Sequence, residues 1–337
     1  MTATAPVPDA APQTDRRPRR VPWWACVLIG IGGAITGLLP WVVTGMRLPL
    51  QNLWATETAP DAMPLALLPF SQYSLTLLFG LIVVGSAAAG IAARAVDDRL
   101  PRGGFLLVML GLLAAQAVAV VQPALVLRDN LQERTASTLY LGGLLAVCVV
   151  SVLIGLVTLL LIARAPRAGA LLGLTVGAIA AGAWLGGFFQ PLLVAGSDVA
   201  STIAGLLPWA APVLVGIAIA WTGLNTVGRV IAALISLGLL WVAPAAMTAV
   251  SSAAGSRVLA RDPLAMMDYA IAVFQMALFT PEIALRPIIA AVVVAVVGLV
   301  VRWSIRAARR RRASAPGEPV VPQPASPATP TETTAPE

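Results

Sequence analysis

The chain has 337 residues, of which 58% are hydrophobic and only 11% are charged, against roughly 25% charged residues in soluble domains. This composition excludes an ordinary soluble protein and predicts an all-α, polytopic transmembrane helix bundle, since each crossing of the bilayer needs about 20 apolar residues. All 22 basic residues are arginine and histidine is absent. The chain therefore lacks an ATPase-loop lysine, histidine metal ligands and a histidine general base, and we predict no cofactor, no metal site and no ATPase of its own.

Residues 1–20 form a basic N-terminal tail whose proline, alanine and threonine content is typical of disorder. The apolar run 23–43 is too long for the hydrophobic region of a signal peptide, and no clear Ala-x-Ala cleavage site follows it. We interpret this run as an uncleaved first transmembrane helix. It opens a membrane domain predicted over residues 21–303.

Further apolar segments bring the number of predicted spans to about eight, and they cover residues 74–93, 105–127, 139–163, 169–194, 203–224, 230–250 and 287–303. Two stretches, Gln122 to Gly155 and Gln190 to Gly216, repeat the motifs Gln-Pro, Ala-Ser-Thr and Val-Leu-Ile/Val-Gly in the same order. This repetition favours four tandem helical hairpins. Chance similarity within an alphabet of alanine, leucine, valine and glycine is the alternative.

The segment 264–279 lies between Pro263 and Pro281 and is short for a span. If it crossed the bilayer, the arginine cluster 309–312 would move to the outside, against the rule that positive loops stay inside. We therefore predict an outer re-entrant or interfacial helix for this segment.

Most arginines fall in alternate loops, which places both termini in the cytoplasm of a cell whose arginine-rich, lysine-free composition is typical of a GC-rich bacterium. The predicted location is the cell membrane. The last cluster, made of Arg309, Arg310, Arg311 and Arg312, is expected to bind anionic inner-leaflet lipid at about 1 kcal/mol per residue, which leaves no need for a nucleic-acid partner. Residues 304–337 are predicted to form a basic and then Pro/Ala/Thr-rich disordered tail.

Polar residues beside prolines carry the functional prediction, because proline frees backbone carbonyls and transporters build solute sites at broken helices. The predicted polar cavity is made of Gln116, Gln122, Gln190, Asp268, Gln275, Glu282 and Arg286. It favours a permease-like protein that moves a small solute or lipid. The alternative for the glutamines is structural, namely repair of helix kinks and bridges between neighbouring helices.

Two other functions stay open. The spans hold no ionisable group away from their predicted ends, which favours a non-catalytic accessory or assembly subunit with a membrane-protein partner or a second copy of the chain. A lipid-linked transferase would need an outer-loop acid, Glu57 or Asp61, together with Arg257 or Arg261. No spacing motif links these four residues, so solvated loop charge also explains them, and we assign no catalytic residue.

Overall fold

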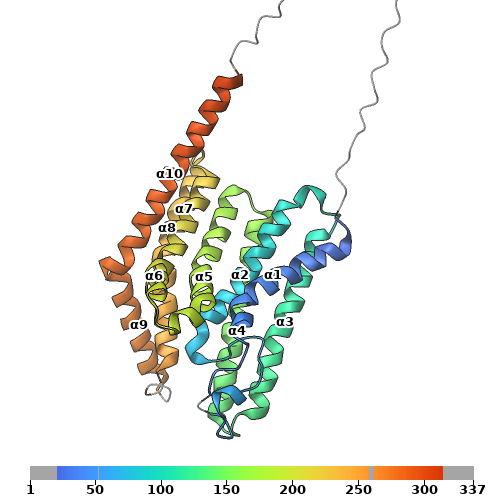
Figure 1. Ribbon diagram of the computed structural model, residues 1–337, viewed down its shortest axis with the longest axis vertical. Helices are drawn as coiled ribbons and strands as arrows, with labels where there is room; N and C mark the ends of the chain where they lie inside the picture. Colours follow the sequence, from blue (N-terminus) through green and yellow to red (C-terminus); the bar gives the residue numbers. More distant parts are fainter. Residues whose placement is uncertain (1–20, 52, 257, 259–261, 314–337) are drawn as a thin grey trace, which may run out of the picture. The chain divides into compact units, whose positions relative to one another are not determined.

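The computed structural model describes residues 21–51, 53–256, 258 and 262–313, and of residues 281–284 and 310–313 it describes the backbone alone. These residues are almost entirely helical (Figure 1), with the helices α1 Trp23–Val43, α2 Leu75–Ala95, α3 Gly104–Asn130, α4 Thr135–Arg164, α5 Arg167–Val194, α6 Asp198–Leu206, α7 Ala210–Thr222, α8 Val227–Gly255, α9 Pro263–Phe279 and α10 Pro281–Ala313. The predicted all-α fold is confirmed for this part of the chain.

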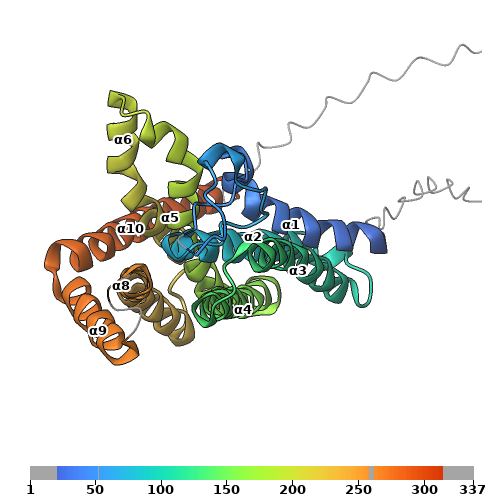
Figure 2. The same ribbon diagram turned by 90° about the horizontal axis from the view of Figure 1, so that it is seen from below.

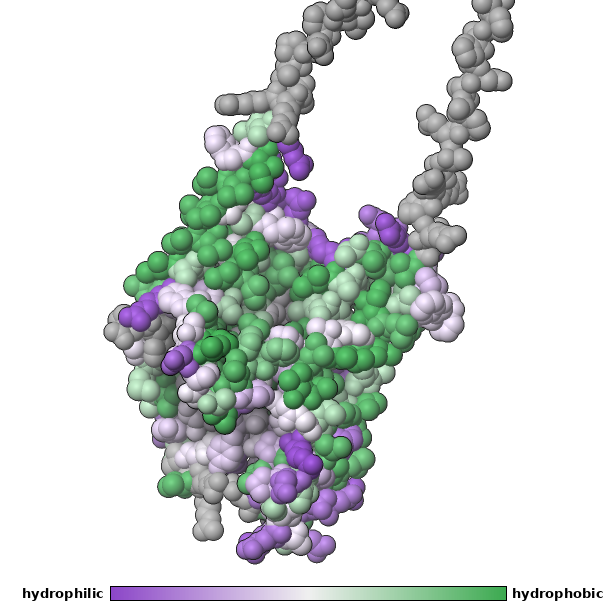
Figure 3. Space-filling view, in the orientation of Figure 1, coloured by the Kyte–Doolittle hydropathy of each residue, from purple (hydrophilic) through white to green (hydrophobic). Residues whose placement is uncertain are grey.

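Eight helical segments among the described residues are long and apolar enough to cross a membrane, as predicted. Figure 3 shows their apolar side chains covering the face of the molecule between polar ends. The sixth span differs from the single helix predicted, because it consists of α6, the 3-10 turn Leu207–Trp209 and α7. Pro208 explains this break, since proline lacks a backbone N–H and its ring clashes with the preceding helical turn.

Contacts within the chain define one unit that ends at Leu299 and a second that begins at Val300, where α10 continues as a helix to Ala313. The boundary predicted at residue 303 therefore falls inside a helix. Residues 1–20 and 314–337, predicted as disordered tails, lie outside the described residues.

Helix α2 is the centre of the N-terminal half of the bundle, since it packs on α1, α4 and α5. Gly37 of α1 permits the closest of these approaches, because a Cβ at this position would collide with the carbonyl oxygen of Leu81. Trp184 of α5 donates its indole N–H to the Gly37 carbonyl at 2.8 Å. The hairpins are thus not independent units, since α3 packs chiefly on α1 and α4 chiefly on α2. The internal repeat stays a prediction.

Arginines cluster at one end of the bundle, which we name the arginine end. They are Arg94, Arg99, Arg102, Arg164 and Arg167. Arg94 donates to the carbonyl of Ile162 at 2.6 Å and to that of Ala165 at 3.0 Å, and so satisfies free carbonyls at the C-terminus of α4. Its guanidinium also lies 5.6 Å from the ring centroid of Trp221. This arginine therefore joins α2, α4 and α7.

A compact segment covers the opposite end of the bundle, and we name residues 44–70 the cap. Sequence reasoning noted the polar residues of this segment, but Leu48, Met63, Leu68 and Phe70 within it are almost fully buried. They share one hydrophobic cluster with residues from α1 to α4. The indole N–H of Trp41 donates to the Ala66 carbonyl at 2.6 Å and fastens the cap to α1. The cap is therefore part of the core.

The short helix α9 runs beside the second half of α8 (Figures 1 and 2). Pro263 and Met266 at its start line a small cavity with Ala253 near the end of α8, and the Leu278 carbonyl near its end accepts from the indole of Trp241, in the middle of α8, at 2.9 Å. A short helix that runs from the end of a neighbouring span to its middle is the arrangement expected of a re-entrant helix. Helix α10 consequently begins beside the middle of α8 and not at the end of the bundle.

Candidate functional site: a cavity beside Arg286

A cavity of about 700 Å³ lies among the later helices, within the size range of ligand sites. Its lining comes from α2 (Thr76), α5 (Ile179, Gly182, Ala183), the α6–α7 segment (Gly205, Leu207, Pro208, Trp209, Ala211, Pro212), α8 (Leu240, Trp241, Pro244, Ala245, Met247, Thr248), α9 (Ala277) and α10 (Arg286, Pro287). The cavity therefore forms where segments far apart in the sequence meet.

Broken helices and small side chains explain why space remains here. The turn Leu207–Trp209 interrupts the sixth span, and the break after Phe279 separates α9 from α10. Gly182 and Gly205 face open space, because a Cβ at either position would have no atom of a neighbouring residue within 4 Å. Proline-interrupted helices that face a cavity avoid presenting unsatisfied backbone groups to lipid.

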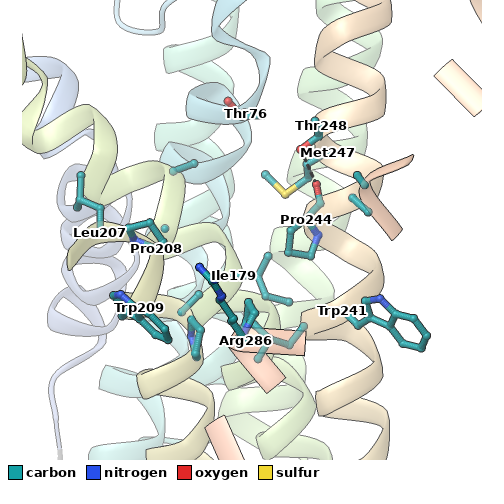
Figure 4. Close-up of a pocket in the computed structure, with 18 of the residues that line it drawn as sticks. Thr76, Ile179, Leu207, Pro208, Trp209, Trp241, Pro244, Met247, Thr248 and Arg286 are labelled. Carbon is teal, nitrogen blue, oxygen red and sulfur yellow. Dashed lines mark hydrogen bonds between the residues drawn. The ribbon is translucent and has the colours of Figure 1, made fainter. Parts of the chain in front are cut away.

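Arg286 is the only charged residue among the described residues that line the cavity. Figure 4 shows its side chain extending into the cavity beside Ile179 and toward Pro208 and Trp209. Ile179 belongs to the middle of α5, and the side chain of Arg286 itself is exposed to the open cavity. The guanidinium gives this side of the cavity a positive charge.

The other polar groups of the cavity are neutral. Thr248 donates its hydroxyl to the Pro244 carbonyl at 2.9 Å, and the indole of Trp241 is engaged with Leu278. No hydrogen bond is found within the described part of the chain for the indole N–H of Trp209 or the hydroxyl of Thr76, so both remain available to a ligand. The site thus offers one cation and neutral polar groups on an apolar wall.

A second, strongly apolar cavity of about 360 Å³ adjoins the first and shares Thr76 and Met247 with it. Residues of α2, α4 and α8 form its walls, among them Phe79, Val150 and Val250. We name the first cavity, which Arg286 lines, the charged chamber and the second cavity the apolar groove. This combination is suited to an amphipathic molecule.

The buried glutamine Gln116 does not line either of these cavities. Its amide nitrogen donates to the Ile82 carbonyl at 3.1 Å and to the Ser86 hydroxyl at 3.0 Å, both in α2. Its Oε1 atom is buried and has no partner among the described residues. Gln116 therefore bridges α3 and α2, which is the structural alternative weighed for the glutamines.

The two Gln-Pro glutamines have different surroundings. Gln122 accepts from the backbone N–H of Leu67 at 2.9 Å and donates to the Leu65 carbonyl at 2.9 Å, so it holds the cap. Gln190, near the end of α5, is exposed and makes no hydrogen bond within the described residues. The structure does not bring Gln116, Gln122 and Gln190 together.

Among the other predicted residues, Arg286 alone lines the large cavity. Asp268 and Gln275 lie on exposed positions of α9, and the side chain of Glu282 lies outside the described residues. Arg309 lies on an exposed position of the second unit, while the side chains of Arg310, Arg311 and Arg312 are not among those described. The expected lipid contact of this cluster stays a prediction.

The residues considered for a transferase do not form a described site. Glu57 and Asp61 are exposed residues of the cap, and Arg257 and Arg261 lie outside the described residues.

Sequence reasoning placed Arg286 in a loop before a span that starts at Pro287, whereas α10 starts at Pro281 and includes both residues. Arg286 is the second residue of the apolar helical segment Leu285–Arg309, so it lies at the N-terminal end of this span. Pro281 was the available signal, since proline is tolerated in the first turn of a helix, whereas Pro287 lies inside α10. No pattern in the sequence indicated that α7 and Trp209 contribute to the site.

Comparison with models of protein families, with curated proteins and with solved structures finds no match for this chain.

Proposed function

We propose that this multi-pass membrane protein is permease-like and moves an amphipathic small molecule or lipid through the cavity between α5, α7, α8 and α10. The single observation that carries the proposal is the 700 Å³ cavity, in which broken helices surround a fixed charge next to an apolar groove. Transporter sites occupy this kind of position, at discontinuous helices near mid-membrane. The absence of lysine and histidine from the sequence favours movement without an ATPase of its own.

We further propose that the arginine end faces the cytoplasm and the cap faces outward, because arginine-rich loops are retained inside. Single cysteines at Asp61 in the cap and Asp98 at the arginine end test this orientation, since the native Cys26 and Cys148 are buried. A membrane-impermeant maleimide should label Asp61→Cys in right-side-out spheroplasts, and should label Asp98→Cys only after permeabilisation. The reverse labelling pattern would contradict the orientation.

Filling the cavity tests the transport proposal. Gly182→Leu should lower the flux of a fluorescent phosphatidylglycerol across proteoliposomes by at least about tenfold, since about 1.4 kcal/mol of lost interaction suffices for that factor. The leucine side chain enters open space in the cavity. Gly142→Leu is the matched control, because Gly142 is also a helical glycine with open space beside it but lies on an exposed position of α4.

Equal flux in the two glycine variants, or flux no greater than in empty vesicles for the unaltered protein, would contradict the transport proposal. The second result would favour the accessory subunit instead. One observation supports that alternative: large apolar residues of α10 such as Leu285, Ile289, Val293 and Val297 are exposed and available to a partner helix as well as to lipid. Co-purification of a defined membrane partner in mild detergent, together with absent flux, would identify this function.

A further inference from the structure

We infer that the cavity selects lipids with a phosphate headgroup, which Arg286 binds; this inference rests on the proposed function and specifies its substrate class.

Arg286 is a single positive charge on the wall of a cavity whose other described lining residues are neutral. The side chain extends from α10 toward the middle of α5, where the surrounding wall is formed by residues such as Ile179 and Leu240 (Figure 4). A charge beside apolar walls is stabilised when water or an opposite charge accompanies it. A bound anion would supply that opposite charge.

The described lining supplies no carboxylate to fill this role. The ion pair found among the described residues is Arg164–Asp97, at the arginine end. Glu282 lies one helical turn before Arg286 on α10. Trp209 also lines the cavity and carries an indole N–H donor. The planar guanidinium of Arg286 suits the several oxygens of a phosphate.

The adjoining apolar groove distinguishes a lipid from a soluble phosphate. It shares the lining residues Thr76 and Met247 with the charged chamber and is walled by α2, α4 and α8. An acyl chain would bury apolar surface there while its headgroup reaches Arg286. A soluble phosphate ester would leave this groove without a ligand.

The experiment measures flux of two fluorescent lipids with matched acyl chains, phosphatidylglycerol and a glucosyl diacylglycerol that lacks phosphate. The full-length protein should prefer the phospholipid, and Arg286→Gln should lower that preference by about tenfold, the range expected for loss of one charge-assisted contact. Arg286→Lys should retain part of the preference because it keeps the charge. Arg167→Gln, which removes an exposed arginine at the opposite end of α5, is the control and should change nothing.

Glu282→Gln separates a ligand site from an internal ion pair. If Arg286 binds the lipid phosphate, phospholipid preference should persist or rise in this variant. An unchanged preference in Arg286→Gln, or loss of folding in Glu282→Gln alone as judged by size-exclusion chromatography, would overturn the inference. Inhibition of phospholipid flux by equimolar glycerol phosphate would overturn the lipid assignment. Loss of flux for both lipids in Gly182→Leu, with no effect of Arg286→Gln, would leave the transport proposal standing and reject its charge selectivity.

Discussion

Replacing Gly30 with valine is expected to prevent stable packing of α1 against α3 and to lower the free energy of unfolding by at least about 3 kcal/mol, at the upper end for overpacked cores. A Cβ at Gly30 would collide with the carbonyl oxygen of Val108 and would lie 2.6 Å from the backbone nitrogen of Leu112. These are backbone atoms of a helix and cannot rotate away. The two helices would have to separate.

Gly32→Val provides the matched control two residues further along α1. A Cβ at Gly32 has no atom of a neighbouring residue within 4 Å, while the change in helix propensity is the same in both variants. Thermal unfolding in detergent, followed by size-exclusion chromatography of the unheated samples, compares the two. Equal stability of the two variants would show that α1 and α3 do not approach each other in this way.

Truncation of Phe70 to alanine is expected to cost about 3 to 5 kcal/mol, the usual range for a fully buried phenylalanine. The ring is 0% exposed and joins the cap to the cluster at the ends of α1 to α4. The cap packs against residues inside the spans, such as Leu81 and Ala119, so its core is stabilised by close packing of apolar side chains. Loss of the ring should therefore release the cap from the bundle.

Limited proteolysis measures that release, as cleavage within residues 44–70 of the purified protein. Leu65→Ala is the control, since Leu65 also belongs to the cap but its side chain is 58% exposed, and surface changes of this kind usually shift stability by less than about 0.5 kcal/mol. Similar protease sensitivity in the Phe70 and Leu65 variants would contradict a core role for the cap.

Two similar motifs with different surroundings show what the sequence alone can and cannot identify. Gln122-Pro123 and Gln190-Pro191 occur at comparable places in their spans, yet the first glutamine binds the cap and the second is exposed. The difference comes from Leu65 and Leu67, which lie far away in the sequence. No local pattern identifies such a partner.

The amino-acid sequence by itself determined the number of helices in the described residues that are long and apolar enough to span a membrane, because a peptide backbone in lipid must satisfy its own hydrogen bonds and long apolar runs do so by forming helices. Only the tertiary structure decided which polar groups face a cavity. Helix surfaces that face lipid and those that face protein are both apolar here, so hydrophobic periodicity does not identify the packing side of a span. The chamber beside Arg286 arises where breaks in two distant spans meet α5 and α8, and that meeting is a property of packing between segments.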